Sequence, residues 1–103
     1  MPYSVYTESV FEWDPRKAAA NATKHAVSFD TAVTVFLDPA ALDGPDLQHS
    51  GTETRRLRVG LAADGRVLMV AYTLRRTNDG EKIRIISARR ASRRERTAYR
   101  GPD

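Results

Sequence analysis

The arrangement of three strand-like segments in the second half of the chain restricts the possible folds more than any other feature of the sequence. The segments are Arg55–Ala62, Arg66–Leu74 and Lys82–Ala88, and only short turns separate them. The first turn contains Asp64 followed by Gly65, a pair that is typical of tight β-hairpins. Because strands joined by short turns run antiparallel, the three segments predict an antiparallel meander.

A short strand and a helix are predicted near the start of the chain. Residues 10–13 alternate between apolar and polar side chains, which indicates a short strand. Asp14 suits the N-cap of a helix, and Pro15 suits its first position. The alanine-rich segment that follows predicts a helix that runs to about His25.

Two further helices are predicted, one before the meander and one after it. Ser28 is suited to cap the first of them, and residues 38–39, an Asp-Pro pair, are suited to stop it. Its apolar residues have the spacing of one buried helix face: Phe29, Ala32, Val33 and Phe36. Ser92 and Glu95 form a capping-box pattern, so the last helix is predicted to begin there and to run towards Arg100.

Helices and strands that are segregated in this way predict a single α+β domain covering residues 1–103, with two N-terminal helices and a C-terminal helix on a small antiparallel sheet. Hydrophobic residues make up 41% of the chain, enough for a globular core. Residues 39–54 are predicted to form a long polar loop, and such loops are often functional. No apolar segment approaches the roughly 20 residues of a membrane helix, and no signal peptide is evident, so we expect a cytoplasmic protein without membrane partners.

Charge is distributed unevenly along the chain. Residues 1–54 contain three basic and eight acidic residues, a net charge of −5, whereas residues 55–103 contain fourteen basic and five acidic residues, a net charge of +9. Thirteen of those fourteen basic residues are arginines, whose planar side chain binds phosphate through two-point contacts. This half therefore favours a nucleic-acid ligand, although a solvated basic surface is the common alternative.

Five segments of the chain resemble the BrnT family of toxins. They are WDPRKAAANATKHAVSF (13–29), VFLDP (35–39), D..HS..E.R (46–55), YTLR (72–75) and RIISARRAS..E...Y (84–99). The resemblance implies a RelE-like fold, endoribonuclease activity and a type II toxin–antitoxin pair with a BrnA-type antitoxin. Because the sequence shows no groove-reading helix of its own, we expect DNA to be bound only through the antitoxin. Ala26 departs from the family, which usually has glycine at this point, where a left-handed helix end would form.

RNA cleavage by the neighbouring 2′-hydroxyl needs a base, a group that stabilises the extra charge on phosphorus, and an acid for the leaving oxygen. Arginines can stabilise that charge. Four arginines that match family positions and stand at strand ends are the predicted catalytic arginines: Arg55, Arg75, Arg84 and Arg89. Arg58, inside the first strand of the meander, is a further candidate. Each can instead be an ordinary surface residue, and Arg84 can instead form an ion pair with Glu53.

Three residues are candidates for proton transfer. Glu53 lies two residues before Arg55, so both point to one side if the strand has begun. His49 has the side chain best suited to proton transfer near neutral pH, although it can equally be an ordinary loop residue. Tyr99, in the last helix, can be a proton donor or can simply pack that helix on the sheet.

No metal ion or other cofactor is predicted. The chain has no cysteine, and its two histidines are far apart in the sequence. A cation held by Asp43, Asp46 and His49 in the polar loop is the weaker alternative.

The expected function is therefore a metal-independent ribonuclease toxin, with RNA as substrate and an antitoxin as partner. The alternatives are a non-catalytic nucleic-acid-binding module and a structural subunit of a DNA-binding repressor complex. The sequence shows neither a helix-turn-helix signature nor an aromatic-rich RNA-binding strand, so it gives these alternatives less support.

Overall fold

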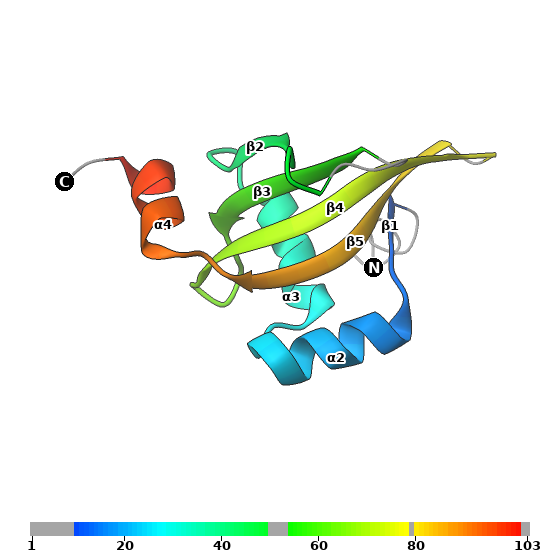
Figure 1. Ribbon diagram of the computed structural model, residues 1–103, viewed down its shortest axis with the longest axis horizontal. Coiled ribbons are helices and arrows are strands. Elements are labelled where there is room, and N and C mark those ends of the chain that lie inside the picture. Colours follow the sequence, from blue (N-terminus) through cyan, green and yellow to red (C-terminus); the bar gives the residue numbers. More distant parts are fainter. Residues whose placement is uncertain (1–9, 50–53, 79, 102–103) are drawn as a thin grey trace.

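Five strands form a single sheet in the order β1-β5-β4-β3-β2 (Figure 1). The computed structural model describes residues 10–49, 54–78 and 80–101. The elements in chain order are β1 (Phe11–Glu12), α2 (Pro15–His25), α3 (Phe29–Val33), the 3₁₀ helix η1 (Thr34–Leu37), β2 (Leu42–Pro45), β3 (Arg55–Leu61), β4 (Val67–Thr77), β5 (Gly80–Arg90) and α4 (Arg93–Arg100). The α+β class and the meander β3-β4-β5 are confirmed.

The sheet is mixed, which corrects the expectation of a purely antiparallel sheet. β1 pairs with β5 in the parallel direction, and the elements from α2 to β4 form the long connection that parallel pairing requires. A second correction concerns the predicted loop 39–54, in which β2 pairs with β3 from Leu42↔Val59 to Pro45↔Arg56. Its sequence, Leu-Asp-Gly-Pro, has little strand preference, and proline is tolerated there because the strand lies at a sheet edge.

Helix ends lie where the capping residues predict them. The side chain of Asp14 accepts a hydrogen bond from the backbone N–H of Arg16 (2.8 Å), and α2 ends at His25. The Ser28 hydroxyl caps α3, which tightens into η1 before the chain turns at Asp38. Ser92 and Glu95 form the predicted capping box of α4. No helix within the described residues has the length and the apolar character needed to cross a lipid bilayer.

α2 and α3 pack on one face of the sheet and bury the core between them and the strands (Figure 1). The core residues come from both layers: Val27, Phe29, Ala32, Val33 and Val35 from the helical segment, and Leu68, Val70, Tyr72, Ile85 and Ala88 from β4 and β5. Phe36 joins the layers, because its ring makes edge-to-face contacts with the rings of Phe11 and Tyr72. We call the opposite side of the sheet the open face.

Asn21 is a buried polar residue that joins α2 to the sheet. Its side-chain amide donates to the carbonyl oxygen of Ala88 (2.8 Å) and to that of Val27 (3.0 Å). Its side-chain oxygen accepts from the backbone N–H of Ala88 (3.1 Å). The amide group therefore satisfies both backbone groups of Ala88, as a neighbouring strand would do.

Ala26, which ends α2, adopts a left-handed conformation with φ of 57°. This conformation costs an L-residue about 1–2 kcal/mol, whereas glycine adopts it freely. Replacing Ala26 by glycine should therefore raise the free energy of unfolding by about 0.5–1 kcal/mol in denaturant titrations, after allowance for the greater freedom of glycine in the unfolded chain. Ala20→Gly, at an exposed position inside the same helix, is the matched control and should lower stability by about 1 kcal/mol. Equal losses in both variants would contradict this account of Ala26.

Candidate functional site

The open face carries all four predicted catalytic arginines. Arg55 in β3 is paired in register with Thr73 in β4, and Thr73 is paired with Arg84 in β5. Paired residues of neighbouring strands direct their side chains to the same face. Arg75 follows Thr73 by two positions, so it shares that face as well.

Arg89 reaches the open face because β5 contains a bulge. Arg84 and Arg89 are five positions apart, so a regular strand would direct them to opposite faces. The register changes at this point, since Ala71 pairs with Ser87 whereas Tyr72 pairs with Ile85. Ile86 is thus the additional residue, and it reverses the alternation between Arg84 and Arg89. One inserted residue brings both arginines to the same side of the sheet.

A groove of about 610 Å³ lies on this face, between the segment after β2 and the start of α4. Its apolar floor comes from Leu57, Met69 and Ala71. Its polar walls include Asp46, His49, Arg55, Arg89 and Glu95. The structure therefore brings together Arg55, Arg89 and His49 from the set predicted by sequence, and adds Asp46 and Glu95.

Arg89 is held by Glu95 of α4 through two parallel hydrogen bonds, Nη1 to Oε1 at 2.8 Å and Nη2 to Oε2 at 2.9 Å. These hydrogen bonds lower the pKa of the Glu95 carboxyl group and raise the pKa of Arg89. The same carboxylate accepts from the backbone N–H of Ser92 in the capping box. Because its pKa is lowered, Glu95 is a weak proton acceptor at neutral pH, and it acts here by fixing the arginine.

His49 is oriented by Asp46. The Asp46 side chain is only 7% exposed, and its Oδ2 lies 3.1 Å from Nδ1 of the imidazole. Because a carboxylate can only accept hydrogen bonds, Nδ1 is the donor, which leaves Nε2 as the atom that can take a proton. The backbone N–H of Asp46 in turn donates to the carbonyl oxygen of Arg55 (2.8 Å), so this segment is tied to β3.

Arg55 and Thr73 bring two unsatisfied polar atoms to the open face. Nε of Arg55 and the hydroxyl of Thr73 are buried, and neither has a hydrogen-bond partner among the described residues. Thr73 as a whole is 1% exposed. Such groups cost about 1–3 kcal/mol each when they stay unpaired, so they commonly mark the place of a water molecule or a ligand.

Arg75 and Arg84 lie outside the groove and share one carboxylate. Oε2 of Glu12 in β1 accepts from Nη1 of Arg75 (2.9 Å) and from Nη1 of Arg84 (3.2 Å). The alternative prediction that Arg84 forms an ion pair is thus confirmed, but its partner among the described residues is Glu12. Glu53, the expected partner and candidate base, lies outside the described residues.

Arg58 lies on the face of the sheet that α3 covers. It donates to the carbonyl oxygens of Val35 (3.2 Å) and Asp38 (3.1 Å), and its guanidinium stacks over the ring of Phe36. It also forms an ion pair with Asp43. These contacts give Arg58 a structural role that fastens η1 and β2 to β3.

Tyr99 and Asp43 also form contacts away from the groove. The Tyr99 hydroxyl donates to Asp38, so the tyrosine fastens α4 to the end of η1. Asp43 binds Arg56 and Arg58 and accepts from the Tyr72 hydroxyl. Asp43 therefore does not join Asp46 and His49, and the described residues contain no group of three or more potential metal ligands.

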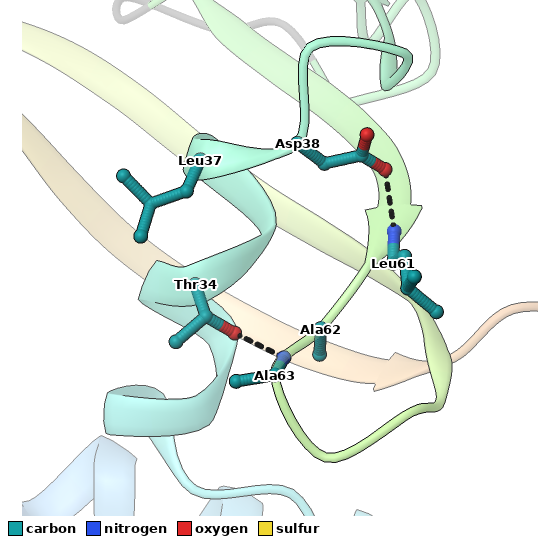
Figure 2. Close-up of a pocket in the computed structure, with 6 residues that line it drawn as sticks. All are labelled: Thr34, Leu37, Asp38, Leu61, Ala62 and Ala63. Atoms are coloured by element: carbon teal, nitrogen blue, oxygen red, sulfur yellow. Dashed lines mark hydrogen bonds between the residues drawn. The ribbon is translucent and has the colours of Figure 1, made fainter.

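A second hollow of about 570 Å³ lies between η1 and the turn after β3 (Figure 2). Leu37 lies on one side of it and Leu61 on the other. The Asp38 carboxylate accepts from the Leu61 backbone N–H (2.8 Å), and this hydrogen bond lowers the pKa of Asp38. The described lining contains no basic side chain, so this hollow is not suited to bind a phosphate.

Two acidic residues that line the groove are not predicted from sequence as part of the catalytic site. Asp46 is considered there only as a cation ligand, and Glu95 only as a helix cap. For Asp46 the available signals are its place in the family segment D..HS..E.R (46–55) and its spacing of three residues before His49. For Glu95 the available signal is its place in the family segment RIISARRAS..E...Y (84–99), although its contact with Arg89 depends on the path of the chain between β5 and α4.

Comparisons with known proteins agree with this fold. Residues 13–95 match the family model described as ribonuclease toxin, BrnT, of type II toxin–antitoxin system. No curated protein matches the sequence. The fold is similar to the 1.1 Å crystal structure of the Brucella abortus ribonuclease toxin, BrnT, with a TM-score of 0.59 and 21% identity over 82% of this chain and 99% of that chain. Since the matched region includes every element from α2 to the capping box of α4, the chain belongs to the BrnT family of ribonuclease toxins of type II toxin–antitoxin systems.

Proposed function

We propose that this ribonuclease cleaves RNA in the groove without a metal ion, with Arg55 and Arg89 binding the scissile phosphate and His49 transferring protons. The observation that carries the proposal is the presence of two arginines and an oriented imidazole around one groove. Arg75 and Arg84 lie outside the groove and are not part of this catalytic set.

The chemistry follows from the positions of these groups. The 2′-oxygen of the RNA attacks the neighbouring phosphorus and the bond from phosphorus to the 5′-oxygen breaks, so one proton must leave the 2′-hydroxyl and another must reach the 5′-oxygen. Nε2 of His49 can accept the first proton and return one to the leaving oxygen. Arg89, fixed by Glu95, and Arg55 stabilise the additional negative charge on the phosphate oxygens. Glu53 remains the sequence-based alternative for the base.

We further propose that the partner is a BrnA-type antitoxin. We also propose that the protein acts in the cytoplasm, the compartment that contains its RNA substrate. The net charge of +9 over residues 55–103 supports an acidic segment of the antitoxin lying on the open face and excluding RNA. DNA would then be bound only through the antitoxin. A relation to RelE-type ribonucleases is also part of the proposal, supported by the antiparallel meander with flanking helices.

Purified protein should cleave single-stranded RNA at an undiminished rate in excess EDTA, because the proposed reaction uses only side chains of the chain. The measurement is the rate of product formation from a labelled oligonucleotide, with and without chelator. A variant that lacks both Arg89 and His49, purified in the same way, controls for contaminating ribonucleases. Loss of activity in EDTA with recovery on adding a divalent ion would contradict the metal-independent mechanism.

Expression of this protein without its antitoxin should arrest cell growth, and co-expression of the antitoxin should restore growth.

A further inference from the structure

Outside the groove, the open face has a second cluster of positive charge, which we call the edge cluster: Arg75, Lys82, Arg84 and Glu12. Lys82 is paired in register with Arg75, and Glu12 with Arg84, so the four side chains share the face. Two arginines therefore contact one carboxylate, and Lys82 adds a third positive charge on the same face. The arginines remain within reach of solvent, since the side chains of Arg75 and Arg84 are 47% and 32% exposed.

The side-chain carboxylate of Glu12 makes the contacts that a separate anion bound to this cluster would make. A single oxygen, Oε2, receives Nη1 of both Arg75 and Arg84 at 2.9 and 3.2 Å. Neither arginine makes the two-point contact of which a guanidinium is capable. A phosphodiester has two exposed oxygens and a full negative charge, so it can use donors that one carboxylate oxygen leaves unused.

A second observation comes from the row of residues that joins this cluster to the groove. Arg55, which lines the groove, is followed across the sheet by Thr73 and then by Arg84. The two outer strands of this row are about 10 Å apart, a distance that a few nucleotides can span. The buried Thr73 hydroxyl and the buried Nε of Arg55 lie in this row without partners among the described residues. One unsatisfied donor on Arg55 and another on Thr73, beside Arg84, favour an anionic ligand that crosses the row.

We propose that the edge cluster is an RNA subsite that binds a phosphodiester flanking the one cleaved in the groove, and that Glu12 occupies the position of this phosphate in the free protein. The inference rests on the proposed cleavage of RNA in the groove. Binding exchanges one anion for another, so Arg75 and Arg84 keep an anionic partner when no substrate is present. The subsite recognises the sugar–phosphate backbone and carries no base preference of its own.

The test measures the affinity of an octanucleotide made of 2′-O-methyl RNA, which cannot be cleaved, by fluorescence anisotropy at several salt concentrations. Glu12→Gln removes the competing carboxylate and should tighten binding about fivefold. Glu81→Gln makes the same change of charge at an exposed position near the cluster on the other face, and is the matched control. The gain from Glu12→Gln should disappear when Arg75 and Arg84 are both replaced by alanine.

Arg75→Ala provides a second line of evidence that does not depend on the stability of the Glu12 variant. It should weaken binding about tenfold and reduce the slope of log affinity against log salt by about 0.7, the value for one lost phosphate contact with a single strand. Unchanged affinity in Arg75→Ala, or equal gains from Glu12→Gln and Glu81→Gln, would overturn the proposal. Because the probe cannot be cleaved, these outcomes are separate from a failure of the wild-type protein to cleave ordinary RNA, which would instead refute the proposed catalysis.

Discussion

Replacing Arg89 by alanine is expected to slow RNA cleavage about a hundredfold, because the transition state loses a charge-assisted donor worth roughly 3 kcal/mol. Arg89 lines the groove, and Glu95 holds its guanidinium in a fixed position. Replacement by lysine should restore only part of the rate, since a point charge cannot reproduce a two-point contact. The measurement is the single-turnover rate with a labelled RNA.

Arg90→Ala is the matched control for this experiment. Arg90 is the next residue of β5, is exposed, and points to the opposite face of the sheet. Its replacement should change the rate less than twofold. Each variant needs a thermal melt, because an unfolded protein is also inactive. If Arg89→Ala melts like the wild type and cleaves at the wild-type rate, the groove is not the catalytic site.

Replacing Asn21 by alanine is expected to lower the free energy of unfolding by about 3 kcal/mol or more. The change leaves the N–H and the carbonyl oxygen of Ala88 without their partner, together with the carbonyl oxygen of Val27. Each buried group left unpaired costs about 1–3 kcal/mol. Chemical denaturation with a constant m-value would measure the loss.

Two further variants show whether the loss at Asn21 comes from these hydrogen bonds. Asn21→Asp keeps an acceptor for the N–H of Ala88 but places a carboxylate against two carbonyl oxygens, so it should be at least as destabilising as alanine. Thr23→Ala, at an exposed position of the same helix, should change stability by less than about 0.5 kcal/mol. A loss below 1 kcal/mol in Asn21→Ala would refute the role assigned to this amide.

Much of the fold could be predicted from the sequence, because its signals are local. Asp14, Ser28 and Ser92 cap the three helices through hydrogen bonds to residues two or three positions away. Asp64 and Gly65 are found in the turn that joins β3 and β4. The left-handed conformation of Ala26 could not be predicted from the residue itself, because alanine departs here from the glycine that the family usually has.

The arrangement of the site could be predicted only in part, because it depends on contacts between distant segments. The bulge at Ile86 has no local signature, yet it decides that Arg84 and Arg89 share a face. Glu12 meets Arg84 across 72 positions of the sequence. β2 could not be predicted because its pairing depends on the free edge of β3 and not on strand preference. The large number of arginines in the second half of the chain predicted that several of them act on one ligand, but it did not predict which of them lie close together.

The amide of Asn21 also bears on how the protein behaves at high concentration. An open strand edge offers a row of unpaired backbone groups, and a second chain can add to it and begin aggregation. Beyond the two-residue β1, Asn21 occupies both backbone groups of Ala88 on the outer edge of β5, so these groups are not available to another molecule. At the opposite edge β2 is only four residues long and contains Pro45, which cannot donate a hydrogen bond. In a basic protein that meets both a partner and RNA, these features leave less of either margin of the sheet for self-association.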